Sequence, residues 1–406
     1  MNLGQGFPNW SPPDFVVSAM VESVTTDGPS TNQYCRPEAH LPLAVALAAD
    51  YNAKWHDLNP SLPQIDPLTM VVTSVGCTKA MYIAIMSLID RTSSDEAILI
   101  EPAFDIYAEQ VKLAGGTNRF VPMKTLLPGT CADQVFQLDW SALALALNDK
   151  TRILVLNTPH NPTGKMFSRD EQLRLADLLR PYPRVVVLAD EVYEHITYGP
   201  NTHVSFASLS SETFGKTLTL SSSGKTFTTT GWKVGWCVGP AELISRLASL
   251  QQWTTFSCPT ITQDAIARCL ATARLPRNGF ANFYDELKDM YSKKRDVLAS
   301  ALREGGLNPI LPAGGFFICA DTTAVVPPPQ VYEEESVACS SRPMTRDWAI
   351  ARHFTQRGGK GVAVIPPSAF YCSENKKLAE NYVRFAFCKT DDLLLEAAER
   401  LKSWNK

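Results

Sequence analysis

Short apolar runs alternate with amphipathic stretches between about residue 70 and residue 240. Six such runs predict buried strands, namely Met70–Thr73, Ala97–Ile100, Ile153–Leu156, Val185–Leu188, Thr217–Leu220 and Val234–Val238. Ser168–Leu179 separates two of these runs and predicts a helix, because Ser168 followed by Glu171 is a capping-box signature. Continuous apolar strands that alternate with helices are typical of a mostly parallel sheet covered on both faces. The pattern therefore predicts a large α/β domain.

The pattern changes after residue 282. Phe283–Arg303 predicts one long charged helix, the chain ends in another predicted helix, and strands are predicted at Gly315–Ala320, Gly361–Ile365 and Tyr382–Phe387. Asp321–Arg346 is rich in Pro, Ser and Glu and predicts a surface loop. We therefore expect a large domain over residues 31–282 and a smaller α+β domain over residues 1–30 and 283–406.

The length, net charge and cysteine content of the chain exclude or disfavour several classes of protein. A chain of 406 residues is long enough for two domains. Its net charge of -3 disfavours nucleic-acid binding. The ten cysteines form no CxxC pair, which argues against a zinc or other metal site and favours free thiols. No run approaches about 18 apolar residues, so no membrane span is predicted. The N-terminus has no signal-peptide pattern, and we expect a cytoplasmic protein.

Lys225 lies in a motif with two interpretations. Ser221–Thr226 follows a predicted strand and ends in Gly-Lys-Thr, as does the P-loop that binds nucleotide phosphates. That loop needs a glycine five residues before Gly224, where Thr219 stands. A partly deprotonated lysine amine can instead bond a cofactor aldehyde. A second basic residue, Lys233, follows eight residues later and favours the cofactor interpretation.

Two charged residues, Asp190 and Arg384, lie at positions where a ligand of opposite charge is expected. Asp190 follows Val185–Leu188, and ligands of open α/β sheets bind at the carboxyl ends of strands, although a helix cap is the plainer alternative. Arg384 lies within an apolar run, where a guanidinium is costly unless it meets an anion such as a carboxylate. Gly76, Cys77 and Thr78 open a predicted helix and can offer backbone N–H groups to a phosphate.

Together these motifs resemble the class I/II aminotransferases, which depend on pyridoxal phosphate (PLP). The most specific stretch is Ser221–Trp236, with the sequence SSSGKTFTTTGWKVGW, which looks like the kynurenine aminotransferase or cysteine-S-conjugate β-lyase branch. The resemblance extends from Asn2 to about Lys402. It implies a fold-type-I PLP transferase, with a mostly parallel sheet in the large domain, that works as a homodimer with shared active sites.

The resemblance also implies a role for each matching residue. Lys225 bonds the cofactor and acts as the catalytic base. The remaining residues implied to bind the cofactor are Gly76, Cys77, Thr78, Phe104, Asn161, Asp190, Tyr193, Ser222, Lys233 and, from the neighbouring subunit, Tyr34. The residues implied to bind the substrate are Gly6, Asn161, Arg384 and, from the neighbouring subunit, Phe256. His160, next to Asn161, has no role in the family pattern.

This sequence departs from the branch at three points. Cys77 is unusual, Thr78 replaces bulkier aromatic character, and Ser257 stands where histidine is frequent. Family members usually carry an N-terminal arm before the segment that corresponds to Leu3–Gly6, whereas here two residues precede it. The departures at Thr78 and Ser257 bear on which substrate is accepted.

The resemblance implies transfer of an amino group from an aromatic or sulfur-bearing amino acid, kynurenine among them, to a 2-oxo acid. Cysteine-S-conjugate β-lyase activity is the alternative, because both reactions use every residue named above. A P-loop nucleotide-binding protein and a non-catalytic regulator with a PLP domain are the alternatives from other classes. The sequence does not define the amino donor, the acceptor or the pathway.

Overall fold

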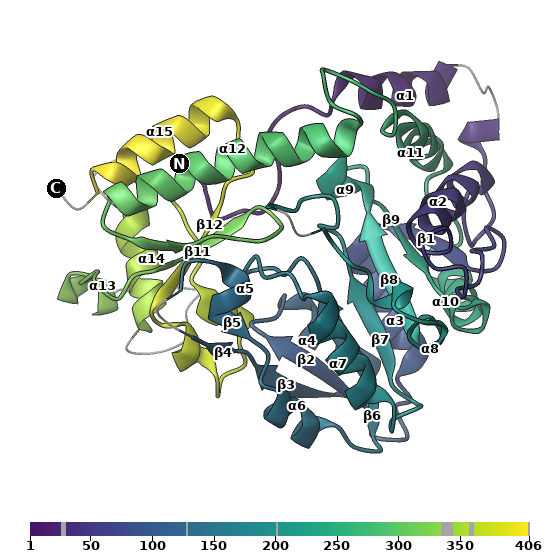
Figure 1. Ribbon diagram of the computed structural model, residues 1–406, viewed down its shortest axis with the longest axis horizontal. Coiled ribbons are helices and arrows are strands. Elements are labelled where there is room, and N and C mark those ends of the chain that lie inside the picture. The colour runs from purple at the N-terminus through teal and green to yellow at the C-terminus, as the bar shows by residue number, and fades with distance from the viewer. Residues whose placement is uncertain (26–29, 127–128, 200–201, 334–343, 357–360, 405–406) are drawn as a thin grey trace.

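A seven-stranded sheet forms the centre of the molecule. The computed structural model describes residues 1–25, 30–126, 129–199, 202–333, 344–356 and 361–404 (Figure 1). The strands of the sheet are β1 (Val71–Val75), β2 (Glu96–Glu101), β3 (Thr117–Pro122), β6 (Thr151–Asn157), β7 (Val186–Asp190), β8 (Thr217–Ser222) and β9 (Val234–Val238). They lie in the order β1-β9-β8-β7-β6-β2-β3, and β9 alone runs against its neighbours. The predicted mostly parallel sheet is confirmed.

Helices cover both faces of this sheet. On one face lie α3 (Cys77–Leu88), α4 (Ile106–Ala114) and α10 (Ala241–Thr254), and on the other α5 (Ala132–Val135), α6 (Trp140–Ala146) and α7 (Arg169–Leu179). Alternate residues of one strand serve the two faces: Ile153 of β6 packs in the first cluster and Leu154 in the second. This is why the strands read as continuous apolar runs. The predicted capping box of α7, Ser168 with Glu171, is present.

A group of helices lies at the β1 and β9 edge of the sheet, on the right of Figure 1. It contains α1 (Asp14–Thr25), α2 (Leu41–Lys54) and α11 (Thr260–Thr272), and α11 packs against both of the others. Two short helices, α8 (Ser211–Gly215) and α9 (Ser223–Thr226), flank β8. The remaining 3-10 turns include Pro367–Phe370.

A second sheet is built from residues near the C-terminus. Its antiparallel strands are β10 (Asn308–Ile310), β11 (Phe317–Asp321) and β12 (Tyr382–Ala386). It is accompanied by α12 (Phe283–Glu304), α13 (Pro329–Glu333), α14 (Arg346–Gln356) and α15 (Asp391–Lys402), while β4 (Lys124–Thr125) pairs with β5 (Phe136–Gln137) elsewhere. In Figure 1, α12 and α15 lie side by side above this sheet.

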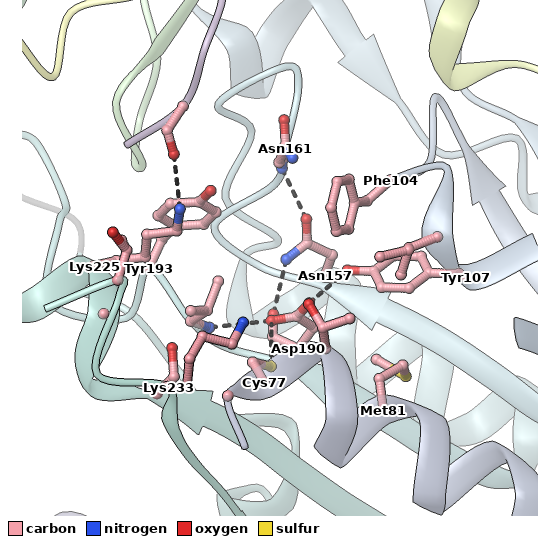
Figure 2. A pocket seen from close by; sticks show the side chains of 18 of the residues that line it. Cys77, Met81, Phe104, Tyr107, Asn157, Asn161, Asp190, Tyr193, Lys225 and Lys233 are labelled. Atoms are coloured by element: carbon pink, nitrogen blue, oxygen red, sulfur yellow. Dashed lines mark hydrogen bonds between the residues drawn. The ribbon is translucent and has the colours of Figure 1, made fainter. Parts of the chain in front are cut away.

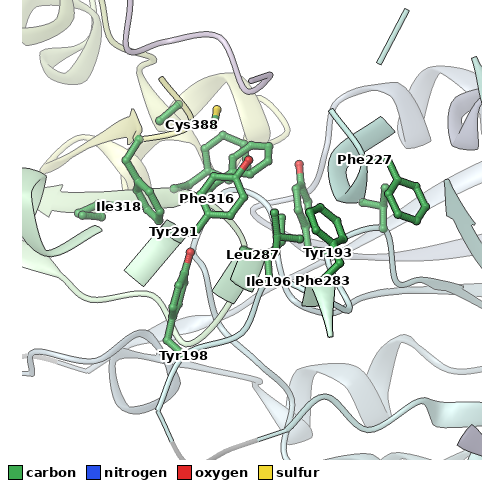
Figure 3. Close-up of a cluster of buried hydrophobic side chains, with 14 of the residues drawn as sticks. Tyr193, Ile196, Tyr198, Phe227, Phe283, Leu287, Tyr291, Phe316, Ile318 and Cys388 are labelled. Atoms are coloured by element: carbon green, nitrogen blue, oxygen red, sulfur yellow. The ribbon is translucent and has the colours of Figure 1, made fainter. Parts of the chain in front are cut away.

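Aromatic side chains join the second sheet to the segment after β7. Tyr193 lies edge-on to Phe316 at 5.1 Å between ring centroids, and Tyr291 of α12 lies 5.7 Å from Phe316 (Figure 3). This packing places β11 and β12 beside the carboxyl ends of the parallel strands. The division into domains at residues 30 and 283 stays a prediction.

Three details differ from the sequence prediction. The predicted strand Gly361–Ile365 is wrong: Ala363 and Ile365 form only isolated bridges, and Pro366, which lacks an N–H group, follows at once. The segment predicted as the loop Asp321–Arg346 contains the helix α13, and its residues 334–343 lie outside the described part. Strands β3 and β10 were not predicted. Most residues of β3 are exposed or partly buried, so this strand lacks the continuous apolar run of a buried strand.

Two further predictions concern cysteines and membranes. Nine cysteines are free thiols, and Cys339 lies outside the described residues. Within the described ranges, no helix combines the length and apolar character needed to cross a bilayer.

Candidate active site

A cavity of about 270 Å³ opens at the carboxyl edge of the parallel strands. It is lined from both sheets, because Arg384 of β12 and Phe317 of β11 border it together with residues at or after the ends of β1, β2, β6, β7 and β8. Figure 2 shows Asn157, Asp190 and Lys225 around this cavity. The predicted site residues that line it are Gly6, Gly76, Cys77, Thr78, Phe104, Asn161, Asp190, Tyr193, Ser222, Lys225, Lys233 and Arg384. Residues up to 378 positions apart in the chain thus share one cavity, from Gly6 to Arg384.

The turn between β1 and α3 forms one wall of the cavity. Gly76 has a φ of 80°, which favours glycine, and a Cβ there would lie 3.1 Å from Nζ of Lys233. Gly235 of β9 supports this turn from behind, where a Cβ would come within 2.5 Å of the Cys77 nitrogen. The start of α3, the Lys233 amine and Ser222 at the start of α9 therefore converge. Backbone N–H groups at a helix start and a lysine are suited to bind a phosphate.

Asp190, the last residue of β7, forms the base of the cavity. Its Oδ2 atom accepts a hydrogen bond from the Tyr107 hydroxyl at 2.5 Å, and its Oδ1 atom accepts from the Val192 N–H at 3.3 Å and the Cys77 thiol at 3.8 Å. Burial raises the pKa of the Asp190 carboxyl, while the hydrogen bonds from Tyr107 and Val192 oppose that rise. No salt bridge to Asp190 occurs within the described residues.

A chain of hydrogen bonds connects Asp190 to Arg384. Asn157 at the end of β6 donates to the Asp190 carbonyl at 2.9 Å and accepts from the Asn161 N–H at 2.8 Å. The Oδ1 atom of Asn161 accepts from Nη1 of Arg384 at 2.8 Å, and Nη2 of Arg384 donates to the Gly4 carbonyl at 2.7 Å. These hydrogen bonds fix the positions of Asp190 and Arg384 relative to each other.

Arg384 is a buried cation that forms no salt bridge with any residue the structure describes. Its guanidinium lies 4.2 Å from the centre of the Phe317 ring and 4.9 Å from that of Phe370. Burial lowers the pKa of Arg384 to about 10. The Nε atom is buried and has no hydrogen-bond partner in the part of the chain that the structure describes. A buried guanidinium of this kind is stabilised when a carboxylate accepts two parallel hydrogen bonds from N–H groups at its edge.

Lys225 projects from α9 toward the same cavity. Its Nζ atom donates to the Gly6 carbonyl at 2.7 Å and lies 5.5 Å from the centre of the Phe316 ring. Burial lowers the pKa of Lys225, and the charge of Arg384 lowers it further. A larger share of neutral amine at a given pH makes Lys225 a better nucleophile and base. A Cβ at Gly6 would lie 2.5 Å from the Phe317 ring, so this close backbone approach needs glycine.

Two predicted residues lie outside the cavity. The side chains of Tyr34 and Phe256 are 82% and 52% exposed and meet edge-on, with ring centroids 5.2 Å apart. The structure therefore does not bring them to the cavity of their own chain. His160 is buried and contacts Thr163 at 2.8 Å, as suits a residue of the turn.

Comparison with known proteins places the chain in a family. The model of the family "Aminotransferase class I and II" matches residues 1–401. The chain belongs to the class I and II aminotransferases. It is 39% identical to a kynurenine–oxoglutarate transaminase of Dictyostelium discoideum, over 98% of this chain and 89% of that protein. It is 35% identical to human kynurenine–oxoglutarate transaminase 3, over 100% of this chain and 85% of that protein.

Solved structures of aminotransferases share the fold. Bna3p of Saccharomyces cerevisiae, a candidate kynurenine aminotransferase, has a TM-score of 0.90 and 31% identity, over 100% of this chain and 91% of that one. YbdL of Escherichia coli, for which a methionine aminotransferase function was identified, has a TM-score of 0.82 and 30% identity, over 99% and 92%. The fold-type-I prediction is confirmed, and the protein is a transaminase. The P-loop and regulator alternatives are removed.

Class I and II aminotransferases depend on PLP, and the cavity of this family member fits that group. PLP is an aromatic ring with a basic nitrogen, a phenolic oxygen, a phosphate and an aldehyde. Among the described residues, no cation pairs with Asp190 and no anion pairs with Lys233, and Phe104 lines the same cavity with an aromatic ring. Lys225 supplies an amine with a lowered pKa, and the polar side chains of Asn161 and Tyr193 also line the cavity. The nitrogen, ring, phosphate, aldehyde and phenolic oxygen of PLP therefore each have a chemical complement.

Several lining or supporting residues escaped sequence reasoning, among them Tyr107, Asn157, Phe317 and Phe370. Asn157 and Tyr107 stand within motifs that the sequence singles out, and the strand-end position of Asn157 was an available signal. Phe370 could not be found in this way. It reaches Arg384 through a turn held by the hydrogen bond from the Ala103 N–H to the Phe370 carbonyl, at 2.8 Å.

Proposed function

We propose that this transaminase uses PLP and acts on kynurenine-type substrates, that is, aromatic or sulfur-bearing amino acids, with a 2-oxo acid as acceptor. The observation that carries the proposal is a buried guanidinium, Arg384, that shares a cavity with the partly buried amine of Lys225. The names of the relatives support kynurenine as donor and 2-oxoglutarate as acceptor. The methionine aminotransferase neighbour supports sulfur-bearing substrates.

The cofactor would be held by residues from several elements. Asp190 would pair with the ring nitrogen, Phe104 would stack on the ring, and Asn161 and Tyr193 would bond the phenolic oxygen. The phosphate would be bound by Gly76, Cys77, Thr78, Ser222 and Lys233. When bound, PLP supplies an aldehyde that bonds an amine and a protonated ring that takes up electrons from the substrate.

The substrate would be oriented by Arg384 and handled by Lys225. Arg384 binds the α-carboxylate with its planar fork, in place of its present bonds to Asn161 and Gly4. The backbone of Gly6 borders the same space. Lys225 leaves the Gly6 carbonyl, and its neutral Nζ atom accepts the proton from the substrate Cα as a general base. Phe317 and Phe370 exclude water around the guanidinium.

The β-lyase alternative would use the same residues on a cysteine S-conjugate. The relatives named above are transaminases, which favours amino transfer as the principal reaction. The two outcomes separate after Cα has lost its proton, so the cavity geometry is common to both.

We further propose a homodimer in which Tyr34 and Phe256 serve the partner's cavity. Both rings are exposed on the single chain and pack on each other, and Trp253 nearby in the sequence is 82% exposed. Exposed aromatic groups of this kind are frequent at protein interfaces. A cytoplasmic location stays a prediction.

The test is a pair of assays on protein reconstituted with PLP. Kynurenine or methionine with 2-oxoglutarate should yield glutamate, and the Lys225→Ala variant should yield none. A cysteine S-conjugate is incubated in parallel, and pyruvate with ammonia is measured. Stoichiometric pyruvate and ammonia without glutamate would overturn the preference for transamination. Absence of amino transfer from every aromatic and sulfur-bearing donor would overturn the substrate class.

A further inference from the structure

Two neutral side chains donate hydrogen bonds to the carboxylate of Asp190. Tyr107 of α4 donates its hydroxyl to Oδ2 at 2.5 Å, and Cys77 of α3 donates its thiol to Oδ1 at 3.8 Å (Figure 2). The Tyr107 bond is the shorter and the better placed of the two, since a thiol is a weak donor. A hydrogen bond from a hydroxyl to a carboxylate at this length is strong.

Both donors keep their protons. The pKa of the Tyr107 hydroxyl and the pKa of the Cys77 thiol are raised well above their ordinary values, first by burial and then by the neighbouring Asp190 charge. Tyr107 therefore stays a hydrogen-bond donor throughout the accessible pH range. It stabilises the anionic form of Asp190 without adding a cation that would compete with a positively charged ligand.

The two donors are held as one unit. Gln110, three residues after Tyr107 in α4, donates to the Thr78 carbonyl in the first turn of α3 at 3.0 Å. Tyr107 is also fixed by an edge-on contact with Phe104, with ring centroids 5.7 Å apart. The position of the Tyr107 hydroxyl thus depends on the packing of α4 against α3, which restricts the movement of the side chain. This rigidity suits a group that orients another side chain.

We propose that Tyr107 is a positioning residue that acts through Asp190: its hydroxyl orients the carboxylate and keeps it anionic, so that Asp190 can hold the ring nitrogen of the cofactor in the protonated state. Cys77 supports the second oxygen of the same carboxylate. The proposal rests on the proposed use of PLP. It adds a residue to the electron-withdrawing half of the site that the sequence motifs do not assign.

The test uses holoenzyme reconstituted with PLP labelled with ¹⁵N in the ring. In the wild type the ¹⁵N chemical shift should report a protonated nitrogen from pH 6 to pH 9. In Tyr107→Phe the ring nitrogen should lose its proton at lower pH, and the dissociation constant of PLP should rise roughly 10- to 100-fold, as expected for loss of a hydrogen bond to a charged group. Cys77→Ala should show the same changes to a smaller degree.

A double-mutant cycle separates positioning from a general structural role. If Tyr107 acts through Asp190, adding Tyr107→Phe to Asp190→Asn should change PLP affinity and the ¹⁵N shift little beyond Asp190→Asn alone. Tyr198→Phe is the matched control, because Tyr198 is also buried and its hydroxyl donates to the Gly315 carbonyl at 2.7 Å. That control should leave the ¹⁵N shift and the PLP affinity unchanged.

The outcomes distinguish this proposal from the proposed function. If Tyr107→Phe keeps the wild-type ¹⁵N titration and PLP affinity, or if its effects simply add to those of Asp190→Asn, Tyr107 is not a positioning residue. PLP binding by the wild type would still stand in that case. If the wild type itself shows no bound ¹⁵N signal, the use of PLP fails, and the proposal fails with it.

Discussion

The Nη1 atom of Arg384 lies 2.8 Å from Oδ1 of Asn161, although Arg384 belongs to β12 of the second sheet and Asn161 to the turn after β6 of the first. Asn161 is tied through Asn157 to Asp190, so the cation proposed to bind the substrate and the anion proposed to bind the cofactor belong to one hydrogen-bonded chain. A carboxylate that binds Arg384 would compete for Nη1. The relationship therefore connects substrate binding to the cofactor side of the cavity.

Replacement of this guanidinium should damage substrate binding selectively. Arg384→Lys keeps a positive charge but cannot form two parallel bonds to a carboxylate. We expect kcat/KM for the amino donor to fall roughly 100-fold, the equivalent of about 3 kcal/mol, while PLP stays bound. Steady-state kinetics and the absorbance of the bound cofactor check both points. Arg119→Lys, on the exposed β3, is the control. Unchanged KM values for both substrates would remove Arg384 from its proposed role.

The turn at Gly76, proposed to bind the cofactor phosphate, packs closely against Gly235. Gly235→Ala would place a Cβ 2.5 Å from the Cys77 nitrogen, and this backbone atom cannot move away without distorting the turn. We expect PLP affinity to fall at least about tenfold and the stability of the apoprotein to fall by about 1–3 kcal/mol. Titration with PLP and denaturant unfolding provide the two measurements.

The matched control is Gly231→Ala, where a Cβ would meet nothing within 4 Å. That variant should bind PLP like the wild type. Equal PLP affinity in the Gly235 and Gly231 variants would show that the turn does not contribute to phosphate binding.

The free energy of unfolding should decrease at acid pH because of His195. Its ring is partly buried, stacks on Tyr284 at 4.0 Å and lies 3.5 Å from Nζ of Lys54. Burial, with the Lys54 charge, lowers the pKa of His195 from 6.5 to about 4. Since the unfolded state binds the proton more readily, stability is fully present above pH 6.5 and is lost as pH falls toward 4. The expected loss is roughly 3 kcal/mol.

His195→Gln isolates this effect. Denaturant unfolding is measured from pH 7 to pH 4 at one protein concentration, and the wild type should lose roughly 3 kcal/mol more than the variant. Parallel profiles for the two proteins would show that His195 does not cause the loss.

Shared active sites can be tested by subunit complementation. Tyr34→Ala removes a ring proposed to serve the partner, and Lys225→Ala inactivates the chain that carries it. Unfolding and refolding the two inactive proteins together should restore about a quarter of the wild-type activity, because one site in each mixed dimer has both residues. No recovered activity, with mixed dimers present by mass spectrometry, would contradict the exchange of Tyr34.

The sequence predicts the parts of this fold that bury both faces of a strand. Strands such as β6 are continuous apolar runs because Ile153 and Leu154 serve opposite layers. The edge strand β3 escaped prediction, because only one of its residues is buried and its polar composition is that of a loop. Gly361–Ile365 has strand composition but forms only isolated bridges.

The residues of the candidate site can likewise be divided into those that the sequence identifies and those that it does not. Residues in motifs that follow strands, such as Asp190 and Asn161, could be named from the sequence, because strand ends converge at one edge of a parallel sheet. Phe370 could not, since its contact with Arg384 depends on a tertiary turn. The roles of Tyr34 and Phe256 depend on a second subunit, which no property of a single chain defines.

Chemical trapping shows whether Lys225 is the residue that bonds the cofactor. The protein is incubated with PLP, reduced with borohydride and digested, and the labelled peptide is located by mass spectrometry. We expect one cofactor adduct, on Lys225, and no adduct in Lys225→Ala. A label on Lys233 instead, or no label in a correctly folded wild-type protein, would contradict it.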